Sequence, residues 1–455
     1  MLTGEITALV SQSLHEKPMQ NPGSHFAIRD PIHEWIKCSP EEKDIINSPL
    51  VQRLKWIMQL SLVNQAFNGG THSRFSHSLG VMKISGEYMK HLFTYTPLKY
   101  AKLQHKSTHY IQLARLAGLL HDVGHGPFSH CFDHTVYQKI YHVDDGGHDF
   151  ARFDLIRSDL LVQYIKKCGI DSDEIAAVWR ANYKLNDEPT VKNDADGMYS
   201  LIHAVVEGPL GADRIDFTRR DAYYTGTQHL GTTPYRRIID NTNVVQDEKG
   251  VWHLCYNFKC IRDIIHTLDG RLYLYHDVYF NKTSMAATVL IEDIINLIYE
   301  PLRLSEHVKD INKFVFLNDT TLLGMIMSYN IVNNKLNEES EMKLEKAQEL
   351  CKKLMMRQLP KLVHESIVTD LKTEYNRCEY IDEWFPRTDQ SSYRIIRTRV
   401  ISGISPAKFD QYGILFDRGH GSEYESTFSA AKALEKIEYS PSQKPYYLVR
   451  GYIIR

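Results

Sequence analysis

Residues 114–130 read ARLAGLLHDVGHGPFSH, and this segment decides how the rest of the chain is organised. It begins with apolar residues and ends in imidazoles and a carboxylate, with His121 and Asp122 adjacent and His125 and His130 following. Neutral imidazole and ionised carboxylate groups together suit Mn, Fe, Zn and, less well, Mg. We therefore expect an apolar helix that delivers ligands to a divalent metal at the centre of a hydrolytic site.

The His-Asp pair is a weak signal by itself. The chain contains three such pairs, which begin at His121, His148 and His276, so the dipeptide alone does not identify a metal site. A metal needs several ligands, and these come from separate elements of the fold. The remaining ligands must therefore be found elsewhere in the sequence.

A second helix is predicted in THSRFSHSLGVMKISGEYMKHLF (71–93), where Phe75, Leu79 and Met82 share one face. His77 lies near its start. A lone histidine is most often a hydrogen-bonded core or surface residue, and that interpretation stays open. The alternative is that His77 supplies a ligand from this second helix.

A third helix carries the charged run DRIDFTRRD (213–221), and residues 208–211 place Asp213 near its start. Most charge runs of this kind are solvated helix faces with i,i+4 ion pairs. Apolar Ile215 and Phe217 lie among the charges, which favours a buried functional role. We therefore expect Asp213 to be a further candidate ligand.

Length and composition limit the class of protein. A chain of 455 residues accommodates one large domain and a lobe, and a net charge of −2 does not support nucleic-acid binding. Seven cysteines without a C-x-x-C pair indicate reduced thiols. The N-terminus resembles no signal peptide, and no apolar run approaches the length of about 18 residues that spans a membrane. We expect a cytoplasmic protein, or a nuclear one in a eukaryote, that is not secreted.

Local signals predict a mainly α fold with a small α+β lobe. Ser39-Pro40 with Glu42 is a capping-box start, and Ser48-Pro49 opens a second helix over LVQRLKWIMQL. A long amphipathic helix is predicted over 335–359. Strands are expected in the ranges 26–33, 249–263 (a pair), 393–401, 413–416 and 446–454. We divide the chain into an N-terminal tail (1–24), a helical core (25–365) and a C-terminal α+β lobe (366–455).

With His77, His121-Asp122 and Asp213, the pattern H…HD…D resembles that of the HD-domain metal phosphohydrolases. The resemblance extends to the deoxynucleoside triphosphate triphosphohydrolases, and most closely to their branch with SAM and HD domains. It rests on RDPIHEWI, SPLVQRLKWIMQL, THSRFSHSLGV, LLHDVGHGPFSHCFD, GADRIDFTRRDAYY and MMRQLPKLV, and covers roughly residues 26–365. We expect no SAM domain here, because only about 25 residues precede this core.

The resemblance implies an HD-domain core and a role for each matching residue. Four residues would bind the divalent metal (Mn, Fe, Zn or Mg): His77, His121, Asp122 and Asp213. Four would form the reaction centre: His125, His130, His148 and Asp133. Asp133 would orient His130, the general acid for the leaving 5′-oxygen. A metal-activated hydroxide would attack the α-phosphorus of a dNTP, releasing deoxynucleoside and inorganic triphosphate.

Seven residues would hold the dNTP substrate: Gln59, Arg74, Arg214, Asp221, Arg271, Tyr279 and Lys282. The arginines and the lysine would neutralise the triphosphate. Gln59 and Asp221 would contact the sugar 3′-hydroxyl, and Tyr279 would exclude a 2′-hydroxyl. Three positions depart from the family: Phe217 replaces a tyrosine, Arg214 a lysine and Asp149 a glutamate.

The resemblance also implies a homo-oligomer with an activating nucleotide at a subunit interface. Five positions correspond to that site: Asn47, Gln52, Lys55, Arg357 and Lys361. Asn47 replaces an acidic residue and Lys55 an arginine. An amide accepts hydrogen bonds from guanine N1–H and N2–H₂ less well than a carboxylate does. We therefore do not expect activation specific for GTP.

Two other functions stay open from the sequence. One is a different HD-family nucleotidase or phosphodiesterase. The other is a non-catalytic nucleotide sensor or nucleic-acid-binding protein, which the nearly neutral net charge disfavours.

Overall fold

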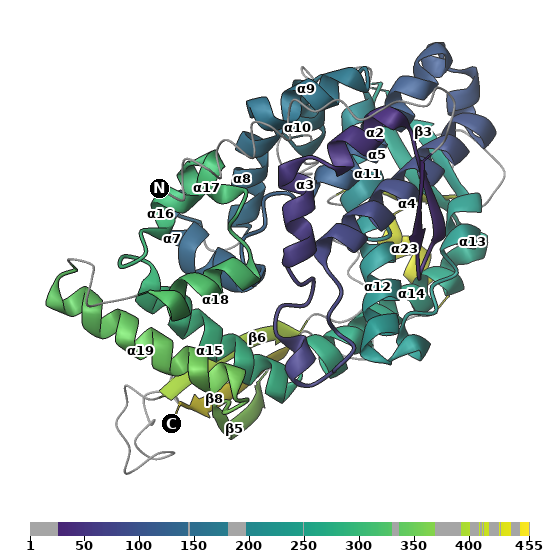
Figure 1. The fold of residues 1–455 in the computed structure, drawn as a ribbon. Helices are drawn as coiled ribbons and strands as arrows, with labels where there is room; N and C mark the ends of the chain where they lie inside the picture. Colours follow the sequence, from purple (N-terminus) through teal and green to yellow (C-terminus); the bar gives the residue numbers. More distant parts are fainter. Residues whose placement is uncertain are drawn as a thin grey trace.

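Two long helices, α4 (Arg74–Tyr95) and α5 (Ser107–Leu120), pack against each other at the centre of the molecule (Figure 1). The computed structural model describes residues 26–143, 146–180, 197–248, 250–329, 336–368, 393–400, 409, 412, 414–417, 427, 429–437 and 446–454. Leu113, Leu116 and Leu120 of α5 are buried, and His121 caps its C-terminal end. The predicted apolar helix that delivers His121 is confirmed.

Helices α11 (Met198–Glu207) and α12 (Ala212–Thr225) pack against α4. The approach of α12 is close because Gly80 has no side chain: a Cβ there would lie 1.9 Å from Asp216 Oδ1. Asp216 and Arg220 are fully buried between the helices. The alternative of a solvated charged face is therefore wrong for the side of α12 that meets α4.

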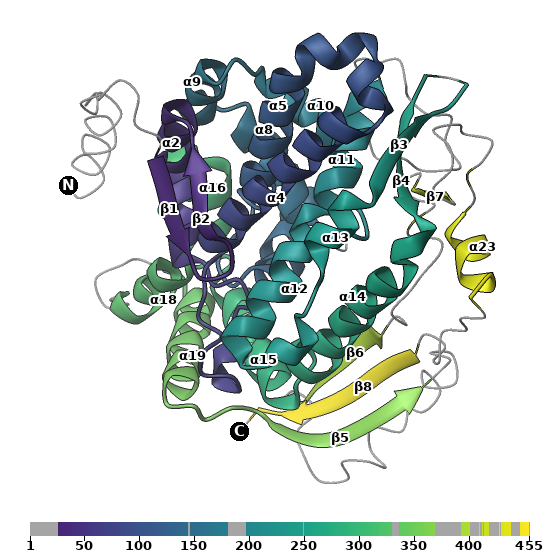
Figure 2. The same ribbon diagram turned by 90° about the vertical axis from the view of Figure 1, so that its right-hand side faces the viewer.

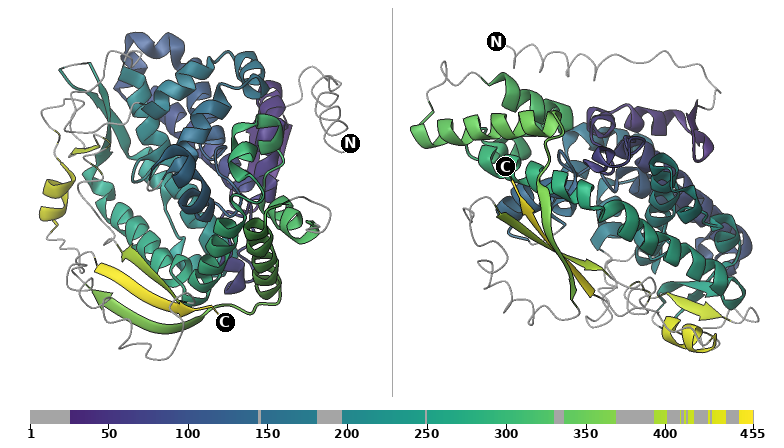
Figure 3. Two further views of the ribbon diagram at one scale, coloured as in Figure 1. Left: turned by 90° about the vertical axis from the view of Figure 1, so that its left-hand side faces the viewer. Right: turned by 90° about the horizontal axis from the view of Figure 1, so that it is seen from below.

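Further helices enclose this centre, and Figures 2 and 3 show them from other sides. In chain order they are α6 (His130–Phe132), α7 (Gln138–Tyr141), α8 (Gly147–Ile156), α9 (Asp159–Lys167), α10 (Ser172–Arg180), α13 (Tyr235–Asp240), α14 (Ile261–Leu274), α15 (Lys282–Ile298), α16 (Leu304–Lys309), α17 (Ile311–Phe314), α18 (Asp319–Ser328) and α19 (Glu338–Met355). The long amphipathic helix predicted over 335–359 is α19, which packs on α15.

The capping signal at Ser39 is confirmed at the start of α2 (Pro40–Ile46). Ser39 Oγ accepts from the Glu42 N–H, and the Glu42 carboxylate accepts from the Ser39 N–H. The same carboxylate accepts from Arg115 and Gln112 on α5. One buried glutamate therefore starts α2 and fastens it to the central helix.

The second predicted helix is shorter than LVQRLKWIMQL indicates. Helix α3 (Pro49–Arg53) passes into one turn of 3-10 helix, and the chain is extended at Ile57. Met58 then pairs with Ser73 in an isolated bridge, and its N–H donates to Asp319. These tertiary contacts override the local helical preference.

The described residues form three small sheets: β1 (Phe26–Asp30) with β2 (Glu34–Cys38); β3 (Thr242–Gln246), β4 (Trp252–Asn257) and β7 (Leu415–Asp417); and β5 (Lys361–Val368), β8 (Tyr446–Ile453) and β6 (Tyr393–Val400). The strand pair β3–β4 begins earlier than the predicted range 249–263. The mainly α fold class is confirmed.

The C-terminal sheet has the strand order β5-β8-β6, with both pairings antiparallel. The boundary expected between residues 365 and 366 falls inside β5, so the core range and the lobe range share this sheet. A short helix, α23 (Ala430–Glu435), belongs to the same part of the chain. The expected tail 1–24 lies outside the described residues. Within the described chain, no helix combines the length and apolar character needed to cross a membrane.

Candidate metal centre

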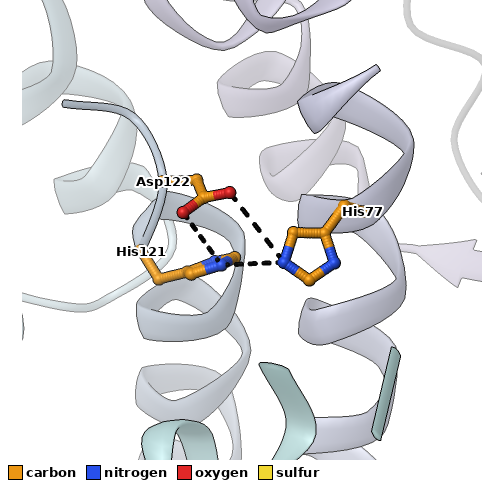
Figure 4. A group of neighbouring side chains, drawn as sticks. All are labelled: His77, His121 and Asp122. Atoms are coloured by element: carbon orange, nitrogen blue, oxygen red, sulfur yellow. Dashed lines mark hydrogen bonds and ion pairs between the residues drawn. The ribbon is translucent and has the colours of Figure 1, made fainter. Parts of the chain in front are cut away.

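Helix α4 and the C-terminal end of α5 bring three predicted ligands together. One donor atom each from His77, His121 and Asp122 lies within 4.8 Å of the others, and all three residues are buried (Figure 4). His77 Nε2 lies 3.1 Å from His121 Nε2 and 3.8 Å from Asp122 Oδ2. Such a buried group of two imidazoles and a carboxylate can hold a divalent metal.

The fourth predicted ligand reaches this cluster from α12. Asp213 Oδ1 lies 3.0 Å from His77 Nε2 and 3.7 Å from His121 Nε2. Gly211 caps α12, so Asp213 stands in its first turn and its side chain can turn towards α4. The structure therefore brings all four predicted ligands into one place.

Both histidines present Nε2 to the cluster because other groups occupy Nδ1. His121 Nδ1 lies 2.8 Å from the Gly118 carbonyl oxygen, and His77 Nδ1 lies 2.8 Å from Asp216 Oδ2. Partners of this kind fix the tautomer and ring orientation of metal-binding histidines. The donors and their backing groups thus fit a divalent cation.

The group behind His77 was not assigned a role from the sequence. Asp216 Oδ1 lies 2.5 Å from His33 Nε2, and Arg220 pairs with both Asp216 and Asp30. All of these side chains are buried. The i,i+4 spacing of Asp216 and Arg220 was visible in IDFTRRD, but His33 and Asp30 come from the distant β1–β2 hairpin.

The charges of the cluster favour proton or metal binding. Burial opposes a charge on His77, but Asp213, Asp216 and Asp122 outweigh it and raise the pKa of His77 to about 10. Burial alone would raise the pKa of Asp122, yet Arg74 outweighs it and holds that pKa well below its usual range. Asp122 is therefore an anion at neutral pH, ready for a cation.

A second histidine cluster adjoins the first and is centred on Asp133. Asp133 Oδ2 lies 2.8 Å from His148 Nδ1, 3.1 Å from His130 Nδ1 and 3.8 Å from His125 Nδ1. His125 Nε2 lies 3.4 Å from Asp122 Oδ1, which joins the two clusters. Asp133 thus contacts all three predicted reaction-centre histidines, not only His130.

Burial and neighbouring charges shift the pKa values of these groups in different directions. Hydrogen bonds from His130 and His148 outweigh burial and hold the pKa of Asp133 well below its usual range. Asp133 in turn raises the pKa of His148, against the effect of burial. Burial, Arg74 and His148 together lower the pKa of His125. His130 is the exposed member, with 62% of its side chain accessible.

The loop that carries these clusters is fastened from two other helices. Arg53 on α3 donates to the carbonyl oxygens of Val123 and His125. Asp319, at the start of α18, accepts from the N–H groups of Met58 and Phe128. Burial raises the pKa of Asp319 to about 6. Neither Arg53 nor Asp319 was singled out from the sequence, because their partners are backbone groups far along the chain.

The predicted phosphate-binding residues fall into two groups. Arg74 is buried and donates to Asp122 Oδ2 at 2.6 Å and to Ser129, so it is part of the metal centre itself. Arg214 and Arg271 donate to the consecutive carbonyls of Gly208 and Pro209, at 2.9 and 3.0 Å. Burial and the charge of Arg214 lower the pKa of Arg271 to about 10.

The predicted sugar-binding residues meet beside α12. Tyr279 donates to Asp221 Oδ2 at 2.5 Å, and His72 Nε2 lies 2.8 Å from Asp221 Oδ1. Gln59 Oε1 is buried, with no hydrogen-bond partner in the part of the chain that the structure describes. Lys282 is exposed at the first position of α15.

The five residues of the expected activator site come from two parts of the chain. Asn47 caps the end of α2, Gln52 donates to the Ile46 carbonyl, and the Lys55 ammonium lies 4.6 Å from the centre of the Phe75 ring. Two others follow α19: Arg357, which donates to the Gln65 carbonyl, and Lys361. Their joint role at a subunit interface stays a prediction.

Comparisons with known proteins agree with this geometry. The family model of the HD domain matches residues 74–183, which contain three of the four predicted ligands. The deoxynucleoside triphosphate triphosphohydrolase SAMHD1 homolog of Dictyostelium discoideum is 27% identical over 354 residues, covering 77% of this chain and 62% of that protein. SAMHD1 of Bos taurus is 27% identical over 363 residues, covering 74% of this chain and 58% of that protein.

An HD domain-containing protein of Acanthamoeba polyphaga mimivirus is 25% identical over 405 residues, covering 84% of this chain and 82% of that protein. The chain thus spans about three fifths of the two SAMHD1 relatives, at 62% and 58%, and more of the viral protein. The segment that matches the HD domain model contains His77, His121 and Asp122, the three residues of the candidate metal cluster. The chain therefore contains an HD domain at residues 74–183, and about three quarters of its sequence is similar to the deoxynucleoside triphosphate triphosphohydrolase relatives.

Proposed function

We propose that the chain is a metal-dependent phosphohydrolase that cleaves dNTPs to deoxynucleoside and inorganic triphosphate. The observation that carries this proposal is the composition of helix α12. Within three turns it supplies a carboxylate of the candidate metal cluster (Asp213), a guanidinium that can bind phosphate (Arg214) and the carboxylate that Tyr279 contacts (Asp221). One rigid helix therefore aligns groups suited to a metal, a phosphate chain and a sugar.

The triphosphate would be held by cations that are already oriented. Arg214 and Arg271 are fixed by carbonyl hydrogen bonds, which leaves further guanidinium N–H groups for phosphate oxygens. His77, His121, Asp122 and Asp213 would hold a divalent metal, which would lower the pKa of a water molecule so that its oxygen would act as the nucleophile. Arg74 would hold Asp122 in place during the reaction, through the ion pair at 2.6 Å.

His130 is the best placed proton donor for the leaving 5′-oxygen. Its side chain is exposed, whereas its Nδ1 is held 3.1 Å from Asp133 Oδ2. A carboxylate on Nδ1 leaves Nε2 free to approach the substrate. His148 shares the same carboxylate oxygen, so Asp133 sets the positions of both rings.

Selection of a deoxyribose would come from the Tyr279–Asp221 pair. The hydroxyl of Tyr279 is tied to Asp221 at 2.5 Å, which fixes the phenol ring. A fixed ring under the sugar would leave no room for a 2′-hydroxyl, while Gln59 and Asp221 would supply polar atoms for the 3′-hydroxyl. The unpartnered Gln59 Oε1 of the described structure is consistent with that role.

The test is incubation of each of the four dNTPs with Mn²⁺ or Mg²⁺, with and without added nucleotides, followed by ion-exchange separation of the products. We expect triphosphate and deoxynucleoside from at least one dNTP. His121→Ala should lower the rate by at least about 100-fold because it removes a ligand. His276→Ala is the matched control, since His276 begins another His-Asp pair and is 53% exposed.

Two results would contradict the proposal. One is the absence of triphosphate release from every dNTP under all of these conditions. The other is turnover of deoxynucleoside monophosphates without triphosphate cleavage, which would indicate an HD-family nucleotidase instead.

A further inference from the structure

A cavity of about 430 Å³ lies where the β1–β2 turn meets α12 and α13. The turn contributes His33 and Glu34, α12 contributes Arg219, and the segment into α13 contributes residues 233–237. None of the four predicted metal ligands is among its lining residues in the described chain. Its volume is within the range of small-molecule sites, about 300–1,000 Å³.

Three of the residues that line this cavity each carry a buried polar atom with no hydrogen-bond partner in the described part of the chain: His33 Nδ1, Arg219 Nη1 and Thr233 Oγ1. His33 is only 4% exposed and Thr233 only 9%. Buried polar atoms are nearly always paired, so these three residues offer hydrogen-bonding capacity that a ligand in the cavity would satisfy.

The charge of the lining favours an anion. The guanidinium of Arg219 lies 4.7 Å from the centre of the Tyr235 ring, and Arg236 donates to the Tyr235 hydroxyl, so both cations are oriented. Arg237 is already paired with Asp263 at 2.7 Å. Glu34 is the one carboxylate among the lining residues of the described chain. Its negative charge is outnumbered by the positive charges of Arg219 and Arg236, for which the described structure gives no ion pair.

His33 adds a requirement for a hydroxyl. Its Nε2 lies 2.5 Å from Asp216 Oδ1, and a carboxylate can only accept, so Nε2 donates. In the neutral ring Nδ1 is then an acceptor, which a ligand O–H would satisfy. Lys83 fixes this residue by donating to its carbonyl at 2.8 Å. Hydrogen phosphate and phosphorylated sugars or nucleosides combine anionic oxygens with a hydroxyl.

The cavity is connected to the metal centre through one residue. Asp216 accepts from His33 with Oδ1, while its Oδ2 lies 2.8 Å from Nδ1 of the predicted metal ligand His77. A ligand that bonds His33 therefore changes how Asp216 is shared with His77. Coupling of this kind is reciprocal: the ligand alters metal affinity by the factor by which metal alters ligand affinity.

We propose that this cavity binds a phosphate-bearing ligand with a free hydroxyl and that its occupancy is coupled to metal binding through His33 and Asp216. The site is independent of the proposed dNTP cleavage, because neither its binding nor its coupling requires turnover.

Binding is tested by calorimetric titration of the metal-free protein with inorganic phosphate and, separately, with a nucleoside monophosphate. Arg219→Ala should weaken binding about 10- to 100-fold, and Thr233→Val by about 3- to 10-fold. Arg303→Ala is the control, because its side chain is 75% exposed and Arg303 is not among the residues that line the cavity. Binding of phosphate alone identifies a small-anion site, and binding of the monophosphate alone identifies a nucleoside phosphate site.

Coupling is tested by Mn²⁺ titration with and without a saturating concentration of the ligand that binds. The wild-type affinity should change about 5-fold or more, and His33→Phe should abolish that change. Thr233→Val leaves His33 and Asp216 intact. It should therefore raise the ligand concentration needed for saturation, but the saturating ligand should still change the Mn²⁺ affinity. If wild type and Arg219→Ala bind the ligand with equal affinity, the proposed site is wrong. If the Mn²⁺ affinity of the wild type is the same with and without the ligand, the proposed coupling is wrong.

Discussion

Asp216 orients His77 in the candidate metal centre, because it holds Nδ1 and leaves Nε2 on the side of His121 and Asp122. Asp216→Asn keeps the shape of the side chain but removes the negative charge that accepts the hydrogen bond from His77 Nδ1–H. We expect Mn²⁺ affinity to fall about 10- to 100-fold, as for other partners of metal-binding histidines. Titration of a folded variant measures this, with Asp277→Asn as the exposed control. An unchanged affinity would contradict the positioning role.

The raised pKa of His77 makes metal binding depend on pH. In the metal-free protein this pKa is about 10, so a cation must displace a proton at neutral pH. Between about pH 6 and pH 8 we expect Mn²⁺ affinity to rise about tenfold per pH unit for each proton displaced. The same shift stabilises the metal-free fold below the ordinary pKa of 6.5, and this contribution is lost as the pH rises through 10.

Calorimetry in buffers of different ionisation enthalpy counts the displaced protons. A Mn²⁺ affinity that is flat over this pH range would show that His77 is neutral before the metal binds. His77→Gln should flatten the profile while weakening the binding itself.

Residue types and spacing were enough to single out His77, His121, Asp122 and Asp213, which the structure brings together, because metal chemistry restricts candidate ligands to few side chains. They were not enough for His33, which belongs to a hairpin far from His77 in sequence yet shares Asp216 with it. Asp133 was expected to orient one histidine, but it contacts three. The sequence could not show this because local patterns do not give the orientation of α8, which carries His148.

At the scale of elements, α2 depends on one carboxylate. Glu42 closes the capping box with Ser39 and receives Arg115 from α5. Arg115 outweighs burial and lowers the pKa of Glu42, so this stabilisation is present above the ordinary value of 4.5 and is lost as the pH falls. The capping part could be read from the sequence, whereas the link to α5 could not.

Glu42→Ala should therefore lower the free energy of unfolding by about 3–5 kcal/mol, because it leaves Arg115 without its partner in a largely buried position. Urea denaturation at neutral pH measures the loss. Glu41→Ala is the matched control: Glu41 is exposed on the same first turn, and the change should stay within about 0.5 kcal/mol. Equal effects of the two substitutions would mean that the link to Arg115 contributes nothing.

Helix lengths show where local signals stop being sufficient. The pattern over LVQRLKWIMQL is helical, but Asp319 accepts the Met58 N–H and draws the chain into an extended course. The same carboxylate fastens Phe128, so the early end of α3 brings Met58 next to the loop of the metal centre. The departure from the local pattern thus serves the site.

At the scale of the molecule, the C-terminal sheet is docked on the helix that begins with Lys282. Arg450 donates to the Phe280 carbonyl, and Tyr452 donates to the Lys282 carbonyl at 3.1 Å. Tyr452 also packs on Ala286 and Val289 of α15. The strands could be predicted from their β-branched and aromatic residues, but their position beside a proposed phosphate-binding residue depends on long-range pairing between β5 and β8.

This contact predicts that the lobe supports substrate binding without taking part in the chemistry. Tyr452 is fully buried, so Tyr452→Ala should cost about 3–5 kcal/mol of stability. Because it also loosens the start of α15, it should raise KM for a dNTP more than it lowers kcat. Tyr452→Phe keeps the packing and should lose only about 1 kcal/mol. Tyr95→Ala, at a residue that is 77% exposed, is the control. Denaturation and steady-state kinetics measure both effects, and a fall in kcat at constant KM would assign the lobe to the reaction itself.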